Sequence, residues 1–456
     1  MAPEPRRPSI GLISLGCAKN QVDSEILLGE LARRGHRIVG DAAAAETVIV
    51  NTCAFVEEAR RESIETILEV AARKGHGVSK LLVAGCLVNR SGPELQREIP
   101  EIDGFVALDQ LAEVGGLVEL GGSAPPPAPA HLVFDHTAPR LLTTRGWAYL
   151  KVAEGCDNPC TFCAIPHWRG RFRSRTVASL VEEARRLEAE GAREVCLIAQ
   201  DTTRYGEDLG YGRHGLTRLV EALLAATSIP WLRFLYAYPT TLDEELLRLM
   251  GAERRFLSYL DMPLQHSHPE MLRAMRRGGS PERYRRILDR ARELAPEVFL
   301  RTTFIVGFPG ETDEHFSHLL EFVGAAGFDH LGAFVYSAED GTPAAALPGA
   351  VPAQVARRRW RRLLAHQKPI ALARRRALVG RQLEVFVEGA CEESEHLLQG
   401  RHRGMAPDVD GRVLINDGFA PPGALVELEV TDAYPSDLVG RIVGPVGAPG
   451  VVPAAA

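Results

Sequence analysis

Hydrophobic and polar positions follow two different periods along the first hundred residues. Three short apolar runs have the length of buried strands: 10–15, 47–50 and 81–84. Two longer stretches lie between them, carry apolar residues at helical spacing and end at a glycine: 21–34 and 55–74. A further short helix is expected after Pro93. This β-α-β-α-β order predicts a small doubly wound parallel sheet, so that residues 8–110 form an α/β domain.

The pattern is lost over residues 111–146, where prolines and glycines gather without periodicity, and a linker is expected there. The alternation returns over residues 147–350. Strands are predicted at 148–152, 194–199, 231–237, 256–261, 298–306 and 329–335. Helical stretches such as 177–190 and 216–226 lie between them. About six β/α units are too few for a full eight-fold barrel, so a partial (β/α)6 barrel is predicted.

The last hundred residues change character again. Residues 351–380 are rich in arginine and predict one long connecting helix. Short alternating strands with Gly, Pro and Asp turns follow over residues 381–446, which indicates a small antiparallel β-barrel. Residues 447–456 are rich in proline and alanine, and a flexible tail is expected.

Composition narrows the class of protein. The chain has 456 residues, of which 25% are charged, and a net charge of −6, which argues mildly against a general nucleic-acid binder. No apolar run is long enough to span a bilayer, and the first ten residues lack the apolar core of a secretory signal. A cytoplasmic location is therefore expected. In that compartment thiols are kept reduced, so the eight cysteines are not expected to form disulfides.

Three cysteines lie on one predicted loop directly after a barrel strand, at the spacing C-x3-C-x2-C. These residues, called the loop triad below, are Cys156, Cys160 and Cys163. Three thiolates this close together can each bind one iron of a cubane cluster and leave the fourth iron open to a substrate. The competing interpretation is a zinc site completed by His167.

Three more cysteines are far apart in sequence, yet each follows the end of a predicted strand. These residues, called the sheet triad below, are Cys17, Cys53 and Cys86. The carboxyl ends of parallel strands meet at one edge of a sheet, so topology is expected to bring these thiols together as a second cluster site. The competing interpretation is three independent buried cysteines. Cys196 and Cys391 are interpreted as ordinary residues, in a strand and a barrel loop.

Taken together, these motifs resemble the methylthiotransferases of the radical S-adenosylmethionine (SAM) superfamily. The resemblance covers nearly the whole chain, in the order cluster domain, radical SAM barrel and β-barrel of the TRAM type, which is OB-like. It is similar in particular to the branch that modifies ribosomal proteins. The stretches that carry the resemblance are 14–25, 50–60, 198–206, 235–240, 259–266 and 301–312.

The resemblance implies an enzyme with two 4Fe-4S clusters, held by the six triad cysteines, that uses SAM both as methyl donor and as radical source. It implies transfer of a methylthio group to the β-carbon of an aspartate in the twelfth protein of the small ribosomal subunit, with either the free protein or the assembled ribosomal subunit as the substrate. An electron donor such as flavodoxin or ferredoxin is implied as a partner. The SAM-binding residues that it suggests are Gln200, Asp201, Asp261, Gln265, Ile305 and Gly307.

Sibling enzymes of this family modify adenosine in tRNA, and charge bears on the choice between the two substrates. Residues 381–446 contain twelve acidic residues, five arginines and no lysine, a net charge of −7. Because phosphate binding needs a basic surface, this barrel favours a basic ribosomal protein over tRNA. The sequence is also compatible with a non-catalytic RNA-binding protein that holds structural zinc, and with a radical SAM enzyme of different outcome, such as a plain methyltransferase.

Overall fold

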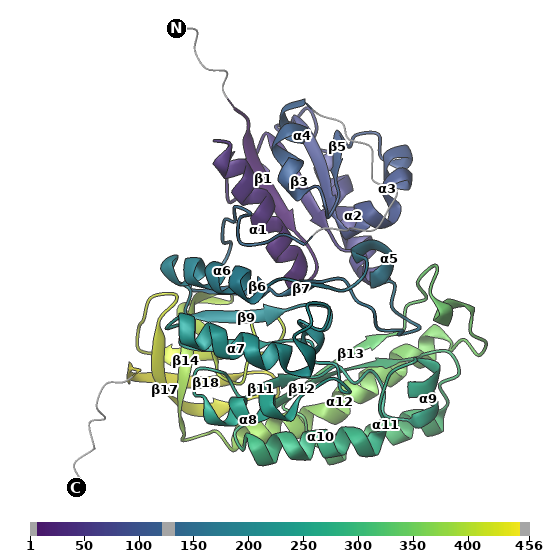
Figure 1. Ribbon diagram of the computed structural model, residues 1–456, viewed down its shortest axis with the longest axis vertical. Coiled ribbons are helices and arrows are strands. Elements are labelled where there is room, and N and C mark those ends of the chain that lie inside the picture. The colour runs from purple at the N-terminus through teal and green to yellow at the C-terminus, as the bar shows by residue number, and fades with distance from the viewer. Residues whose placement is uncertain (1–6, 121–132, 447–456) are drawn as a thin grey trace.

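Three parts follow one another along the chain in the computed structural model, which describes residues 7–120 and 133–446 (Figure 1). The N-terminal α/β domain sits on one end of the central part, and the C-terminal barrel packs beside the central strands. The mixed α/β architecture predicted from the sequence is confirmed. No helix within the described residues is long and apolar enough to cross a membrane.

The N-terminal domain is built on a five-stranded sheet of order β2-β1-β3-β4-β5 in which all neighbouring strands are parallel. Its strands are β1 (Ser9–Ser14), β2 (Arg37–Ile38), β3 (Thr47–Thr52), β4 (Lys80–Gly85) and β5 (Gly104–Val106). Its helices are α1 (Ala18–Arg33), α2 (Glu57–Ala71), α3 (Cys86–Glu98) and α4 (Val114–Leu120). α1 and α4 share a core with one face of the sheet, and α2 and α3 with the other. Both faces are thus covered, as a parallel sheet requires.

Two local features differ from the sequence-based expectation. The helix expected after Pro93 already begins at Cys86. Pro93 is tolerated inside it because Ser91 has a non-helical backbone (φ −135°), so the regular hydrogen-bond pattern is interrupted just before the proline. Residues 111–120, expected to begin the linker, form the short 3-10 helix η2 (Leu111–Glu113) and α4, which pack on α1. The remainder of that segment is described only from residue 133.

The central part contains six parallel strands in two neighbouring sheets, β10-β9-β6 and β11-β12-β13. A bridge between Leu232 and Phe256 connects the two sheets. The strands are β6 (Trp147–Lys151), β9 (Glu194–Ile198), β10 (Trp231–Phe234), β11 (Tyr259–Asp261), β12 (Phe299–Val306) and β13 (His330–Val335). The predicted partial barrel, open between β6 and β13, is confirmed.

Helices cover the outside of this barrel (Figure 1). They are α6 (Val177–Ala189), α7 (Gly215–Ala226), α8 (Glu244–Ala252), α9 (Pro269–Ala274), α10 (Pro281–Leu294) and α11 (Asp313–Ala326). The short helix α5 (Ile165–Arg169) packs instead against α3 of the N-terminal domain. The remaining short elements are β7 (Ala153–Glu154), β8 (Arg173–Ser174) and the 3-10 helices Ala42–Ala44, Thr202–Arg204, Gly212–His214 and Pro343–Ala346.

The C-terminal barrel closes in the strand order β14-β15-β16-β18-β17. Its strands are β14 (Gln382–Cys391), β15 (Ser394–His402), β16 (Val413–Asp417), β17 (Leu425–Ala433) and β18 (Leu438–Pro445). Four pairs are antiparallel as predicted, whereas β16 and β18 pair in parallel. That pairing is what closes the barrel, because β17 already lies antiparallel to both β14 and β18. The expected flexible tail, residues 447–456, lies outside the described residues.

The long helix α12 (Ala353–Arg376) connects the two barrels, and some of its arginines attach it to the central part. Arg359 is buried and bonds Glu311 and Asp313, at 2.9 and 2.8 Å. Arg374 pairs with Asp329. The other arginines of the first two turns are exposed: 357, 358, 361 and 362. The helix therefore uses single arginines to fasten itself to β12–α11 and β13.

A loop of the C-terminal barrel reaches the interior of the central barrel. Asp410 accepts a hydrogen bond from the Tyr259 hydroxyl at 2.6 Å, and its other oxygen lies 3.3 Å from Arg301 Nε. Glu194, at the start of β9, is buried between Arg233 and Arg401, at 2.6 and 2.7 Å. These paired charges fix the C-terminal barrel to the central strands and leave the opposite, carboxyl ends of the strands for the site.

Candidate active site

The loop triad lies between β7 and α5, at the carboxyl end of β6. Backbone hydrogen bonds hold both ends of the loop: Cys156 N donates to Gly170 O at 3.2 Å, and Thr161 N donates to Met275 O at 3.0 Å. Gly155 precedes the first cysteine with φ +78°, and a Cβ atom there would lie 2.1 Å from Arg171 O. Only glycine fits this approach of two backbone segments, so the loop has a fixed shape.

The surroundings of the loop triad stabilise sulfur as a ligand. The backbone N–H of Asn158 donates to Cys156 Sγ at 3.4 Å, and Arg277 Nη1 donates to Cys160 Sγ at 3.7 Å. Burial raises the pKa of Cys156 to about 11 and that of Cys163 to about 12, and the charge of the neighbouring Cys160 adds to both effects. Thiols of this kind ionise when a metal binds them, because the metal then carries the opposing charge.

His167, the fourth ligand of the competing zinc site, is exposed on α5. A Cβ atom built on Gly341 would lie 3.2 Å from its ring, so the imidazole lies beside the turn that follows β13. The structure therefore does not give the loop triad a fourth protein ligand through this residue. Three thiols without a fourth ligand fit a cluster that keeps one iron open.

The structure places each cysteine of the sheet triad at the carboxyl end of its own strand. Cys17 precedes α1 after β1, Cys53 follows β3, and Cys86 begins α3 after β4. β1, β3 and β4 are neighbours in the sheet, so the three thiols share one edge. In the strand order 2-1-3-4-5, the polarity of the connections reverses between β1 and β3, where this type of sheet binds its ligands.

Close packing brings the sheet-triad loops together. A Cβ atom on Gly16 would lie 2.6 Å from Cys53 Cβ, and one on Gly85 would lie 2.2 Å from Asn51 Oδ1. Asn20 bridges all three loops. Its Nδ2 donates to Leu15 O and Thr52 O at 3.0 and 2.7 Å, and its Oδ1 lies 3.6 Å from Cys86 Sγ.

The three sheet-triad thiols differ in their electrostatics. Cys17 is solvent-accessible, yet enough protein surrounds it for burial to oppose ionisation; the cations Lys19 and Arg169 outweigh this and lower its pKa below the ordinary value. Burial raises the pKa of Cys53 to about 11 and that of Cys86 to about 12, with Arg169 acting against it at both. One arginine of the central part thus serves all three thiols of the N-terminal domain.

A buried network of charges joins the two triads. Arg169, just beyond the loop triad, donates to Asn20 Oδ1 at 2.7 Å and Asp23 Oδ2 at 3.0 Å, and to both oxygens of Glu154 at 3.0 Å. Lys151 bonds Asp23 at 2.5 Å and Glu154 at 2.8 Å. All five side chains are buried. Such a network is stable only when every charge is paired, so it holds the N-terminal domain on the carboxyl edge of β6 in one orientation.

Gln200 and Asp201, two of the predicted SAM-binding residues, lie directly against this network and the loop triad. Gln200 Nε2 donates to Glu154 Oε1 at 2.6 Å. Asp201 accepts hydrogen bonds from Asn158 Nδ2 at 2.7 Å and Thr203 Oγ1 at 2.6 Å, and burial raises its pKa. Both side chains are therefore held beside the loop that carries the triad, and a contact with SAM stays a prediction for both.

Asp261 and Gln265 lie at the ends of β11 and its continuation. Asp261 is buried and accepts from Arg301 Nη1 at 2.8 Å and from Tyr236 N at 3.0 Å. Gln265 (φ +71°) and Tyr236 (φ +67°) both have left-handed backbones, which residues other than glycine rarely adopt. Strained residues of this kind gather at functional sites, where the surrounding structure fixes them.

Ile305 and Gly307, at the end of β12, are held by packing. Ile305 is half-buried beside a small core that contains Met271 and Phe308. Gly307 has φ +77°, and a Cβ atom there would lie 2.4 Å from Ala356 Cβ on α12. The close approach of α12 therefore explains why position 307 is a glycine. A contact with SAM stays a prediction for both Ile305 and Gly307.

Sequence reasoning missed several residues of the site: Lys19, Asp23, Lys151, Glu154, Arg169, Tyr236 and Arg301. The one available signal was Lys151, a lysine that ends an otherwise apolar predicted strand. Cys196 and Cys391 are both buried away from the triads, in β9 and at the end of β14. Cys391 belongs to a strand and not to a loop as expected, because β14 continues to a tight turn with β15.

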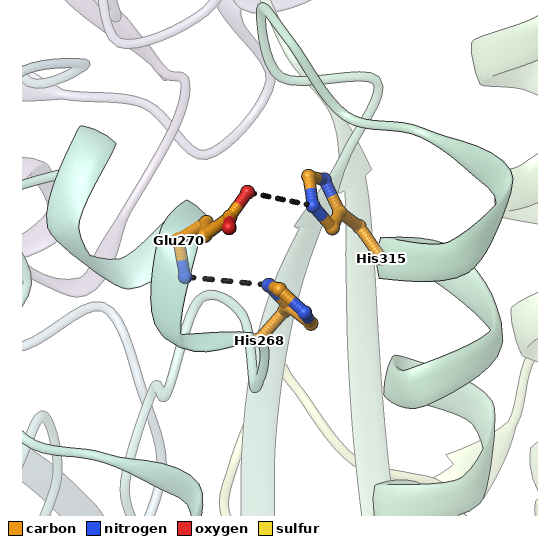
Figure 2. Close-up of side chains that lie close together, drawn as sticks. All are labelled: His268, Glu270 and His315. Atoms are coloured by element: carbon orange, nitrogen blue, oxygen red, sulfur yellow. Dashed lines mark hydrogen bonds and ion pairs between the residues drawn. The ribbon is translucent and has the colours of Figure 1, made fainter.

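A separate group of potential metal ligands, His268, Glu270 and His315, lies at the starts of α9 and α11 (Figure 2). His268 Nδ1 accepts from Glu270 N at 3.3 Å, and His315 Nδ1 accepts from Thr312 N at 3.2 Å. A neutral imidazole has one lone pair, so the proton of His315 is on Nε2, which bonds Glu270 Oε2 at 3.2 Å. The group is thus accounted for as a pair of helix caps.

Comparison with known proteins gives the family of the chain. A family model described as the radical SAM superfamily matches residues 150–323, one described as Uncharacterized protein family UPF0004 matches residues 9–107, and one described as the TRAM domain matches residues 379–443. The chain is 46% identical to the ribosomal protein uS12 methylthiotransferase RimO of Myxococcus xanthus, over 95% of this chain and 92% of that one. It is 44% identical to the RimO protein of Geobacter sulfurreducens, over 96% and 99%.

The chain belongs to the RimO family. It is accordingly a radical SAM methylthiotransferase that uses SAM and 4Fe-4S clusters, and not a non-catalytic zinc or RNA-binding protein. Among solved structures, the radical SAM methyltransferase TsrM of Kitasatospora setae has a TM-score of 0.55 at 16% identity, over 74% of this chain and 77% of that one. That likeness is one of fold.

Proposed function

We propose that the chain transfers a methylthio group to the β-carbon of an aspartate in ribosomal protein uS12. The RimO relatives, similar over nearly their whole length, support this substrate. The observation that carries the proposal is the joining of two cysteine triads, from different domains, by one buried network through Arg169. A reaction that needs a radical source and a sulfur source side by side requires this arrangement.

We assign one 4Fe-4S cluster to each triad. The donor sets fit, because each triad offers three thiols with cations or N–H groups directed at sulfur: Asn158 and Arg277 at the loop triad, Arg169 and Lys19 at the sheet triad. Cys156, Cys160 and Cys163 would hold the cluster that supplies the electron for the reductive cleavage of SAM.

The chain's own residues then have positioning roles. Gln200 and Asp201 are placed to hold the polar end of SAM beside the loop triad, because both are fixed to groups of that loop or its flank. Asp261 and Gln265 lie at the end of β11 and just beyond it, and we assign them to the substrate side. Ile305 and Gly307 are assigned to the adenine side. The strained backbones of Tyr236 and Gln265 keep this edge rigid while the substrate is bound.

The charge of the C-terminal barrel supports a protein substrate over tRNA. Arg401 is buried between Glu194 and Glu388. The other four arginines lie within ion-pairing distance of glutamates: Arg381 of Glu297, Arg403 of Glu384, Arg412 of Glu393 and Arg441 of Glu429. The barrel therefore offers phosphate no unpaired arginine, whereas its surplus of carboxylates suits a basic ribosomal protein.

A one-electron donor such as flavodoxin or ferredoxin completes the proposal. The loop triad holds its cluster close to the open edge between β6 and β13, and all three cysteines are half-buried. A donor of low potential is required because the cluster must be reduced before SAM is cleaved.

The proposal is tested by competition between the two substrates. The anaerobically reconstituted enzyme is incubated with SAM, a chemical reductant, sulfide and equal amounts of uS12 and total tRNA, and both products are analysed by mass spectrometry. A methylthio group on an aspartate of uS12, with unmodified tRNA, is expected. A methylthio group on adenosine, with unmodified uS12, would contradict the proposed substrate.

A further inference from the structure

Lys19 is a buried cation whose side chain has no hydrogen-bond or ion-pair partner among the residues that the structure describes. Its side chain is 7% exposed, and its ammonium lies 3.4 Å from the centre of the Tyr236 ring. Among the buried lysines and arginines in the described part of the chain, it is the one that makes no hydrogen bond or ion pair through its side chain. The others bond carboxylates or carbonyl groups: Lys151, Arg169, Arg175, Arg233, Arg359, Arg375 and Arg401.

This exception calls for a physical reason. Removing an ammonium group from water is costly unless an opposite charge or several acceptors replace the water. The face of an aromatic ring compensates for only part of this loss. The Tyr236 ring therefore holds Lys19 in place, but no protein group within the described ranges accepts a hydrogen bond from its ammonium, and an anionic ligand would supply such an acceptor.

Lys19 lies where the N-terminal domain meets the carboxyl edge of the central barrel. It is two residues from Cys17 on the first turn of α1, and its charge acts on that thiol. Tyr236, on the other side, follows β10 at the carboxyl edge of the barrel, and its backbone N–H bonds Asp261. Glu154 and Asp261 are also near enough to act on Lys19.

The proposed reaction places an anion at this point. The substrate carbon must reach both the radical source at the loop triad and the sulfur source at the sheet triad. In an aspartate, that β-carbon is bonded directly to the carboxylate carbon. A substrate held between the triads therefore brings its carboxylate to the same place, where Lys19 supplies the charge and the hydrogen-bond donors.

We propose that Lys19 binds the side-chain carboxylate of the substrate aspartate and so selects aspartate over its uncharged amide. The inference rests on the proposed function, because it takes an aspartate as the substrate. Lys19 is a specificity-determining residue in this account: it orients the β-carbon and takes no part in bond breaking. Tyr236 acts through it, by holding the ammonium in the free enzyme.

The test compares two substrates and two kinds of variant. The substrates are uS12 and a uS12 variant with asparagine at the modified aspartate. The enzymes are wild type, Lys19→Met, Lys19→Gln and the control Lys74→Met, which removes a lysine of the same domain whose partner is Asp103, far from both triads. Binding is measured first, by fluorescence anisotropy without reductant so that no turnover occurs, and kcat and KM are measured afterwards. Iron content is recorded for each variant.

The expected result is a loss of discrimination. Lys19→Met weakens binding of native uS12 about 10- to 100-fold, the range for losing a hydrogen bond to a charged group, and leaves binding of the asparagine variant unchanged. Lys19→Gln behaves alike, and Lys74→Met equals wild type. The inference would be overturned if Lys19→Met, with normal iron content, bound both substrates equally weakly or bound both as tightly as wild type does. The proposed function would still stand in that case, provided that the wild-type enzyme modified uS12. If wild type modified neither substrate, the proposed function would fail and this inference with it.

If Lys19→Met loses iron, Lys19→Gln decides whether Lys19 recognises the substrate carboxylate, because the glutamine amide still has hydrogen-bond donors but no charge. Binding of native uS12 that falls relative to the asparagine variant supports carboxylate recognition. Loss of iron in both variants, with no selective effect on substrate binding, would show that Lys19 serves the sheet triad and would refute the proposed role.

Discussion

The loop triad and the sheet triad bring three thiols together in different ways. The loop triad lies within eight consecutive residues, and its geometry is set locally, by the loop's backbone hydrogen bonds and by Gly155. The sheet triad spans seventy residues, and its geometry is set by the order of β1, β3 and β4. A local site depends on its loop, whereas a topological site depends on the whole sheet and on whatever fixes the loops at its edge.

The two triads also differ in how they meet the rest of the molecule. The loop triad has Arg277 and Asn158 of its own domain beside its sulfurs. The sheet triad depends on Arg169 from the other domain, which reaches Asn20, the residue that bridges its loops. The sheet triad should therefore be the one that responds to changes at the domain interface, and each prediction below uses this asymmetry.

The largest effect is expected from removing each triad as a whole. Replacing the loop triad by alanines should abolish formation of 5′-deoxyadenosine from SAM, because the radical source is lost. Replacing the sheet triad should abolish methylthiolation of uS12 but retain cleavage of SAM. Both products are measured by liquid chromatography with mass spectrometry. SAM cleavage by the loop-triad variant would contradict the assignment of the two roles.

A large effect on stability is expected from the residue that joins the triads. Arg169→Leu leaves Asp23 and Glu154 with Lys151 as their one remaining cation, and breaking such a buried network destabilises a protein by about 3–5 kcal/mol. Unfolding in urea measures the change. The matched control is Arg171→Leu, an exposed arginine two residues away that pairs with Asp157, for which no measurable change is expected.

Iron content sharpens the same experiment. If the asymmetry holds, Arg169→Leu loses iron from the sheet triad before the loop triad, since only the former depends on this arginine for its loop contacts. Equal loss from both triads would show that the network supports the two sites alike and would remove the distinction drawn above.

A smaller effect on stability is expected from replacing Gly85, the glycine that directly precedes Cys86. Gly85→Ala places a methyl group 2.2 Å from Asn51 Oδ1 and 2.7 Å from Thr52 O, at φ +93°. Gly75→Ala is the matched control in the same domain, with φ +80° and open space around it. Both lose about 1–2 kcal/mol from the left-handed backbone. Gly85→Ala should lose about 1–3 kcal/mol more through overpacking, measured by urea unfolding. Equal losses of unfolding free energy in the two variants would mean that the backbone at the strand ends shifts to accommodate the added methyl group.

The smallest effect is expected in the reactivity of the metal-free thiols. Cys17 has a lowered pKa and is exposed, whereas burial raises the pKa of Cys53, Cys86, Cys156 and Cys163 to between about 11 and about 12. A lower pKa populates the thiolate at lower pH, so Cys17 should be alkylated by iodoacetamide at least about tenfold faster than these four at pH 8. Peptide mass spectrometry after timed quenching measures the rates. Faster labelling of the loop triad would contradict the assignment of cations around Cys17.

The sequence alone predicted those features of the structure that repeat along the chain or that lie close together in it. Periodicity located β1, β3 and β4 and the six strands of the central barrel to within a few residues, but it missed the short strands β2 and β5. Spacing alone located the loop triad. The sheet triad was predicted from a topological rule, since cysteines follow strands that the rule places side by side. The short helix α4 was missed because it has only seven residues, two of which are the poor helix formers Gly115 and Gly116.

Contacts between domains could not be predicted in the same way. Lys151 and Asp23 are 128 positions apart, and no local pattern indicates that two charges so distant will be buried together. The insertion of Asp410 beside Arg301 is of the same kind. Lys19 lies inside the stretch 14–25, which carries the family resemblance. Its burial without a hydrogen-bond or ion-pair partner among the described residues results from the contact between the two domains, which the sequence does not show.

The most direct test of the two-triad account is the anaerobic iron and sulfide content of the wild-type protein and of the two triple-alanine variants. The account predicts about eight irons in the wild type and about four in each variant, because each triad holds one 4Fe-4S cluster independently. About four irons in the wild type, none in the loop-triad variant and no change in the sheet-triad variant would contradict it, since the sheet triad would then hold no cluster.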